Sequence, residues 1–132
     1  MKKNVFLLFA VFIHLFGFSQ WNCQNPSPQG NTLNSIFFTV HDGGFAEGDY
    51  GMIIKTVNGG SVWNALVSGT TENLHSLQFT DVNTGYAAGA GGTILKTSNG
   101  GITWTPLSTG STDQLRSVFF RAQTQGMPWE QI

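Results

Sequence analysis

The side chains that could do chemistry are few and scattered along the chain. The densest group of ligand-type residues consists of Asp42, Glu47 and Asp49. Carboxylate oxygens are the ligands that Ca²⁺ prefers, so weak calcium binding is the metal chemistry to weigh at these residues. We weigh it against ordinary acidic side chains and expect no resident metal and no cofactor.

The histidines do not suggest a hydrolytic or zinc site. His14 lies in an apolar N-terminal segment, and His41 and His75 stand alone. A zinc site needs several ligands, and a Ser-His-Asp triad needs three cooperating groups. No spacing in the sequence suggests either arrangement, so we expect a protein that is not an enzyme.

Composition points to an exported β protein with no affinity for nucleic acid. Charged residues make up 10% of the 132 residues, against about 25% in ordinary soluble domains. The 17 glycines favour an all-β, turn-rich chain. The net charge is −1, and the cations of the repeat region are isolated, which excludes a basic nucleic-acid surface. These cations are Lys55, Lys96, Arg116 and Arg121.

A 41-residue repeat organises most of the chain. It begins at Leu33 with `LNSIFF`, at Leu74 with `LHSLQF` and at Leu115 with `LRSVFF`. The two full units agree at 18 of 41 positions without a gap. Such self-similarity indicates a repeated supersecondary unit.

Turn residues divide each unit into four short strands, which is typical of a β-propeller blade. In the second unit the expected strands are 74–80, 86–89, 93–97 and 102–107. We therefore predict an all-β protein with propeller-type four-stranded repeats, about two blades plus the first strand of a third. The expected segments are a signal peptide (1–19), an N-terminal linker (20–32), blade 1 (33–73), blade 2 (74–114), the first strand of blade 3 (115–120) and an aberrant tail (121–132).

The most specific local motif is `TSNGGITW`, which is preceded one repeat earlier by `TVNGGSVW`. They follow the Asp-box pattern Ser/Thr-x-Asp/Asn-x-Gly-x-Thr-Trp, with asparagine in place of aspartate in both copies and Val62 in place of threonine in the first. We expect the asparagine to accept from turn amides, the glycine to adopt φ > 0 and the tryptophan to cap the apolar interior of the blade. These structural residues are Thr56, Asn58, Gly60, Trp63, Thr97, Asn99, Gly101 and Trp104. Sugar binding by Trp63 and Trp104 is the less favoured alternative.

The combination `GYAAGAGGTILKTSNGGITW`, repeated as `GFAEGDYGMIIKTVNGGSVW`, resembles the repeat of the photosystem II stability/assembly factor family. The resemblance covers 33–120 and implies a β-propeller of Asp-box (BNR, sialidase-type) repeats. It also implies an arginine-rich surface in members that act in photosystem assembly, whereas this chain has only two arginines.

Asp-box propellers include sialidases, which need three arginines for the substrate carboxylate and a tyrosine nucleophile paired with a glutamate. Arg116 and Arg121 are the only arginines, and Tyr50 and Tyr86 lie in or beside turns. A sialidase-like glycosidase is therefore the least favoured function.

The N-terminus has the pattern of an export signal. Lys2 and Lys3 precede an almost unbroken apolar run over 5–18, and cleavage is expected after Ser19. The run is shorter than the ~20 residues of a membrane-spanning helix, so we expect no stable membrane span after cleavage. Cys23 lacks the preceding small residue of a lipoprotein site and is expected to be a plain thiol. The leader and the following segment resemble those of bacterial proteins that use type IX secretion.

The preferred function is a non-catalytic, exported binding module for protein or glycan recognition and adhesion at the cell surface. Its expected partners are an unknown protein or glycan ligand and further blades of a parent protein. An envelope scaffold similar to a photosystem II assembly factor is the alternative from a different class.

Residues 121–132 break the repeat abruptly, and we predict that they are the product of a frameshift. Residues 123–132 align with 82–91, `VNTGYAAGAG`. Back-translated and shifted in frame, they allow `TNTGYAVGAD`. The first alanine and the second glycine of this peptide are forced whatever codons were used. Those two fall opposite Ala87 and Gly89. Sequencing the gene should find further `GTILKT…NGG…W` repeats in the shifted frame, and an early stop codon there would contradict the frameshift.

Overall fold

The structure, a computed structural model, describes residues 30–121. The expected signal peptide (1–19), Cys23 and nearly all of the tail (122–132) lie outside the described residues. Within the described range, no helix has the length and apolar character that a bilayer crossing requires.

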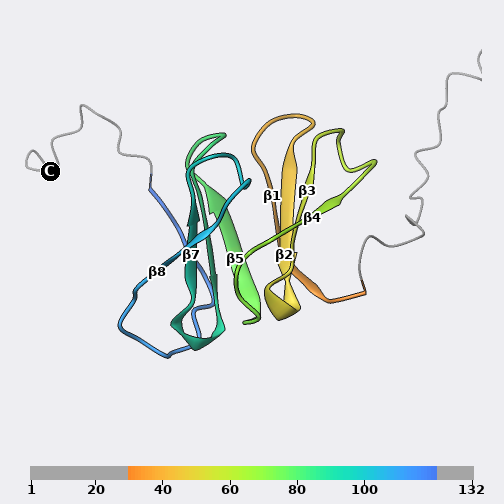
Figure 1. Cartoon of the computed structure of the whole chain (residues 1–132). Helices are drawn as coiled ribbons and strands as arrows, with labels where there is room; N and C mark the ends of the chain where they lie inside the picture. Colours follow the sequence, from red (N-terminus) through yellow and green to blue (C-terminus); the bar gives the residue numbers. More distant parts are fainter. Residues whose placement is uncertain (1–29, 122–132) are drawn as a thin grey trace, which may run out of the picture.

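Two four-stranded antiparallel sheets follow each other along the chain (Figure 1). Sheet order equals chain order in both, β1-β2-β3-β4 and β5-β6-β7-β8. The first sheet, here blade 1, contains β1 (Leu33–Phe38), β2 (Gly44–Gly48), β3 (Ile53–Thr56) and β4 (Asn64–Leu66). Blade 2 contains β5 (Leu74–Phe79), β6 (Gly85–Gly89), β7 (Ile94–Thr97) and β8 (Thr105–Leu107). Short 3-10 turns, η1 (Asp49–Gly51) and η2 (Ala90–Gly92), join the second and third strands of each blade. The predicted all-β fold is confirmed.

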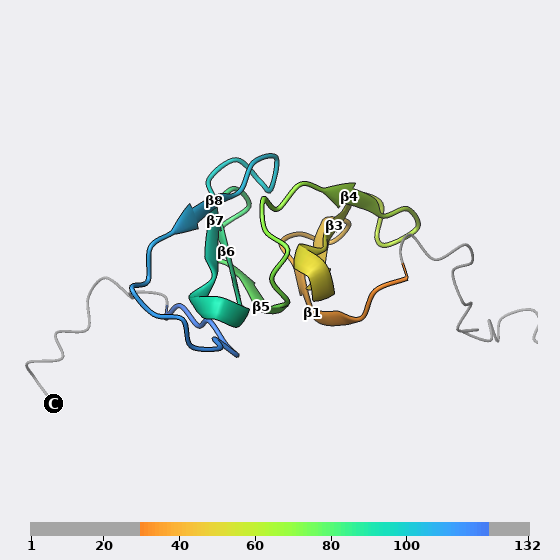
Figure 2. The same cartoon turned by 60° about the horizontal axis from the view of Figure 1, so that its bottom comes forward.

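The blades stand side by side with the same orientation. Figure 2 shows β1 and β5 along one edge of the pair and β4 and β8 along the opposite edge. The chain therefore crosses from the outer strand of blade 1 to the inner strand of blade 2, which is the connection that repeats from blade to blade in a propeller.

The two blades share one strand register. Leu33 pairs with Gly48 and Leu74 with Gly89, and each β1-type strand carries a bulge directly after that pair. At the other end of the hairpin, Phe79 lies opposite Gly85 and covers it so closely that a Cβ there would meet the ring at 2.6 Å. The 41-residue period thus specifies backbone pairing as well as side-chain type.

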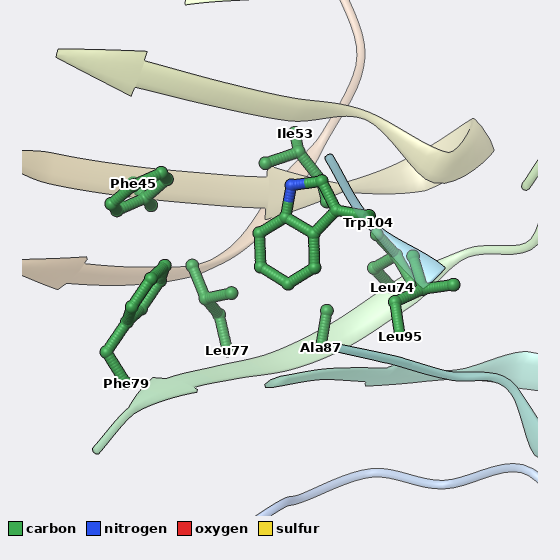
Figure 3. Packing of buried hydrophobic residues seen from close by; sticks show 8 residues of the cluster. All are labelled: Phe45, Ile53, Leu74, Leu77, Phe79, Ala87, Leu95 and Trp104. Atoms are coloured by element: carbon green, nitrogen blue, oxygen red, sulfur yellow. The ribbon is translucent and has the colours of Figure 1, made fainter. Parts of the chain in front are cut away.

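The main core lies between the blades. Blade 1 contributes Phe45 and Ile53, and Figure 3 shows Trp104 inserted between these residues and the side chains of β5, β6 and β7. The Phe45 and Phe79 rings stack at 4.4 Å between centroids, and Trp104 meets Phe79 edge-on at 6.1 Å. The blade 2 members are Leu74, Leu77, Phe79, Ala87, Leu95 and Trp104.

Polar groups also join the blades. The Lys55 Nζ atom donates to the carbonyl oxygen of Gly100 at 2.8 Å, and its ammonium group lies 5.1 Å from the centroid of the Phe45 ring. The backbone amide of Leu77 donates to Ser35 Oγ at 3.2 Å. Side-chain to backbone bonds of this kind fix one sheet against the next without strand pairing.

The segment 115–120 repeats these contacts on the far side of blade 2. The Val118 amide donates to Ser76 Oγ at 2.9 Å, as the Leu77 amide does to Ser35, and the Phe120 ring lies 4.3 Å from the Tyr86 ring. No strand is assigned to this segment in the described part of the chain, because a strand needs a hydrogen-bonded partner strand. A third blade beginning at Leu115 stays a prediction.

One carboxyl group is buried among apolar residues. Glu47 is 0% exposed, and within the described structure neither of its carboxyl oxygens has a hydrogen-bond partner. Burial raises the pKa of Glu47 from its ordinary value of 4.5 to about 8. In blade 2 the equivalent residue is Ala88, which has no polar side-chain group to bury.

We predict that Glu47 makes the fold less stable as pH rises. The folded chain keeps a proton that the unfolded chain releases above pH 4.5. The free energy of unfolding should therefore fall with pH from there to about pH 8, by at most about 1.4 kcal/mol per pH unit for this one group. Glu47→Gln should remove this slope in urea unfolding at pH 5 and pH 8, and exposed Glu72→Gln should keep it. Parallel profiles for the wild type and Glu47→Gln would contradict the assignment.

Candidate functional site

The Asp-box side chains form closed hydrogen-bond networks inside their own turns. Thr97 Oγ1 donates to Asn99 Oδ1 at 3.0 Å and accepts from the Gly101 amide at 2.9 Å. Asn99 Oδ1 also accepts from the Thr103 amide at 3.0 Å. These bonds pair the backbone amides of Gly101 and Thr103 inside the turn.

The first copy repeats that network. Thr56 Oγ1 donates to Asn58 Oδ1 at 3.0 Å and accepts from the Gly60 amide at 2.9 Å. Asn58 Oδ1 accepts from the Val62 amide at 2.9 Å. The six Thr, Asn and Gly positions that the motif singled out are thus brought together in two equivalent turns.

Asparagine in place of aspartate donates one bond in which a carboxylate could only accept. Asn99 Nδ2 donates to Thr103 Oγ1 at 2.8 Å, and a carboxylate has no such donor. Blade 1 has Val62 where blade 2 has Thr103, so its side chain offers no acceptor there.

The glycine of the second turn makes a close approach between the blades. Gly101 has φ +82°, in the left-handed region that side chains rarely adopt. A Cβ there would meet Phe45 Cε1 at 2.5 Å and Leu66 Cδ1 at 3.4 Å. The Asp-box turn of blade 2 is therefore seated on the core residues of blade 1.

The two tryptophans occupy equivalent positions with different surroundings. Trp104 is 7% exposed and packs in the core between the blades, and its indole nitrogen has no hydrogen-bond partner among the described residues. Trp63 is only partly buried, because the described chain places no blade on that side of blade 1. Trp104 packs against the preceding blade, whereas the sequence predicts that it caps the interior of its own blade.

The acidic residues weighed for calcium are held apart. Asp42 lies in the turn before β2 and Asp49 in the turn after it, and a five-residue strand spans about 17 Å. Glu47 lies between them in the sequence, on β2, and is fully buried. Among the residues that the structure describes, no group of three or more potential ligands gathers around a metal position.

The residues weighed for glycosidase and hydrolase chemistry are also spread over the molecule. Tyr50 is 72% exposed in η1, with φ 58°, while Tyr86 packs on Phe120. His75 Nε2 lies 3.0 Å from Gln114 Nε2, and His41 Nε2 lies 3.7 Å from the Oδ1 atom of its neighbour Asp42. None of these contacts pairs a nucleophile with a base.

A hollow of ≈ 360 Å³ opens where β1 and β5 end side by side. Phe37, Phe38 and Phe79 form its apolar wall, and Asp81 lies at its rim. The Asp81 carboxylate accepts from the amides of Asn83 and Thr84, and these bonds lower its pKa. The hollow therefore combines aromatic surface with a carboxylate that stays ionised near neutral pH. Its full lining is Phe37, Phe38, Thr39, Phe79, Thr80, Asp81 and Val82.

A larger and more open hollow of ≈ 630 Å³ lies at the other end of blade 1. Tyr50, Met52 and Val67 are among its lining residues, together with backbone of the connection between β4 and β5. Its only charged side chain is Glu72. It offers less apolar enclosure than the hollow between β1 and β5.

The first of these hollows, between β1 and β5, was not predicted from the sequence. Its residues come from two repeats and meet only because the blades stand side by side. The available signal was the match of Phe38 with Phe79 and of Thr39 with Thr80 at the 41-residue period.

Comparison with known proteins supports the class of fold that this geometry defines, which is the β-propeller. No family model and no curated protein matches the chain. Among solved structures, the chain is similar to YCF48 bound to D1 peptide, with a TM-score of 0.59 and 22% sequence identity. YCF48 is a β-propeller.

The similarity covers 72% of this chain and 31% of that chain. This chain therefore spans about a third of the length of that structure. At this identity the comparison establishes the fold: the two sheets are propeller-type blades. It also supports the repeat architecture that the resemblance to photosystem II assembly factors implied.

We predict that the two tryptophans differ in their contribution to stability. Trp104→Ala should lower the free energy of unfolding by about 3 to 5 kcal/mol, because it empties the core between the blades. Trp63→Ala should cost much less in dilute solution, because that side chain is partly exposed. Equal losses in chemical denaturation would mean that each tryptophan stabilises its own blade alone.

Proposed function

We propose that this chain is a non-catalytic recognition module that binds a protein segment. The observation that carries the proposal is the hollow between β1 and β5, with its aromatic wall and the ionised Asp81. Binding sites for small groups are concave and mostly apolar, with few well-placed polar atoms that provide orientation. An apolar side chain next to a lysine or arginine fits this combination.

The Asp-box residues are a poor alternative for ligand binding. Their oxygens are already hydrogen-bonded inside the turns, and Trp104 is buried between the blades. A sugar would have to break these bonds to use them. This argument favours a peptide over a glycan as the ligand.

The comparison supports the same kind of ligand. One similar solved structure is YCF48 bound to D1 peptide, so a propeller of this type is known to hold a protein segment. For this chain we infer that the ligand is a peptide, without naming a particular one.

We also propose that the module acts after export, in the envelope or at the cell surface. The support is the leader at 1–19, with two lysines followed by an apolar run. An assembly scaffold for other envelope proteins, the alternative from a different class, is the second candidate, because it would also bind protein segments without catalysis.

The test is a screen of the full chain against a linear peptide library and a glycan array side by side. We expect enrichment of peptides that carry an apolar residue beside a basic one. Asp81→Asn keeps the acceptor oxygen of the turn and removes the charge, so it should weaken their binding by about two- to fivefold, the range of an exposed ion pair.

Asp113→Asn is the matched control, because Asp113 is an exposed acid outside the hollow. It should leave peptide affinity unchanged. Binding of glycans without peptides, or equal effects of Asp81→Asn and Asp113→Asn, would contradict the proposal.

A further inference from the structure

Within residues 30–121, each blade buries one face against the other blade. The opposite face of blade 1 is open there, and that of blade 2 is covered only by the segment 115–120. The open face of blade 1 has the residue types that blade 2 buries against blade 1. Leu33 is 44% exposed, Ile36 58% and Phe38 50%, whereas their equivalents in blade 2 are exposed by 0%, 5% and 6%. Those equivalents are Leu74, Leu77 and Phe79.

The open face of blade 2 in turn matches the face of blade 1 that is already covered. Its residues stand one repeat after Phe45, Ile53, Lys55 and Leu66 and are Tyr86, Ile94, Lys96 and Leu107. Ile94 is half-buried and Leu107 is 42% exposed, whereas their equivalents Ile53 and Leu66 are fully and partly buried. The Lys96 ammonium already lies over the Tyr86 ring at 5.7 Å, as that of Lys55 does over Phe45.

We propose that these two faces bind each other between copies of this chain, so that blade 2 of one copy packs against blade 1 of a second copy. The contact between blades within the chain shows that surfaces of this kind fit. The inference rests on the contact between the blades within the chain and not on peptide binding, although Phe38 belongs both to the open face of blade 1 and to the wall of the hollow between β1 and β5.

The internal contact specifies what the second copy must supply. Lys55 donates to the carbonyl oxygen of Gly100, so Lys96 would donate to that of Gly59 in the second copy. Gly101 is seated on Phe45, so Gly60 of the second copy would be seated on Tyr86. Gly60 has φ +89°, and its own Trp63 at 3.6 Å is the nearest group to a Cβ built there.

The segment 115–120 now lies where β1 of the second copy would bind. Its Val118 amide occupies Ser76 Oγ, and its Phe120 ring lies on Tyr86. β1 is the stronger occupant, because it is paired in register with β2, whereas 115–120 has no strand partner among the described residues and leaves Phe119 79% exposed. Association therefore displaces this segment.

A contact between two different faces is heterologous, so it continues from copy to copy until a ring closes. This property gives a sharp test. Ile36→Asp disables only the blade 1 face, and Leu107→Asp disables only the blade 2 face. Both side chains are exposed, so both variants should keep the fold, which circular dichroism checks.

Sedimentation velocity over a range of concentrations should show association of the wild-type chain and a rise of at least tenfold in the dissociation constant of either variant. Mixing the two variants should restore a 1:1 dimer and nothing larger, because one intact face remains on each. Val67→Asp, which replaces a valine that is 84% exposed outside both faces, should associate like the wild type. A wild-type monomer at all concentrations, or a mixture that forms no dimer, would overturn the proposal.

Discussion

The contact between the Phe45 ring of blade 1 and the Phe79 ring of blade 2, which Trp104 meets edge-on, is the interaction on which the rest of the structure depends. Strands of three to six residues cannot make an independently stable sheet when both faces are apolar. Each blade has such faces, so burial requires a neighbouring blade. The stacked rings, 4.4 Å apart between Phe45 and Phe79, supply that burial at the centre of the pair.

The Asp-box turns belong to the same contact. The hydrogen bonds of Thr97 and Asn99 shape the turn, the left-handed glycine allows it to approach Phe45, and Lys55 binds the carbonyl oxygen of Gly100. A motif that looks local in sequence therefore fixes the position of the preceding blade. This explains why its polar residues are occupied and why we place ligand recognition elsewhere.

Sequence predicted the all-β fold and its four-stranded repeats, because glycine and asparagine act on local backbone geometry and the period aligns two copies. It did not predict which blade Trp104 would contact, since that depends on how two twisted sheets pack. It also grouped Glu47 with Asp42 and Asp49 as residues to weigh for calcium binding. The alternation along β2 puts Glu47 on the same face as Phe45, and the apolar Ala88 at the equivalent position was the available signal. The hollow at Asp81 depends on the meeting of two repeats, and no local pattern predicted it.

Copies of one framework can carry different surfaces. Phe37 and Gln78 are equivalent, and so are Phe45 and Tyr86, yet blade 1 turns the more apolar member of each pair toward its neighbour. The covered face of blade 1 is thus more apolar than the equivalent face of blade 2, while the backbone register of the two blades is the same. The repeat maintains the fold, and the residues that differ between copies set what each face can bind.

A double-mutant cycle across the blades tests the central claim that they stabilise each other through this aromatic contact. The cycle compares Phe45→Leu, Phe79→Leu and the double variant by the free energy of unfolding. We predict a coupling energy of about 0.5 to 1.5 kcal/mol, as measured for contacting aromatic pairs. Strictly additive losses would contradict the account, because they would mean that each ring stabilises only its own blade.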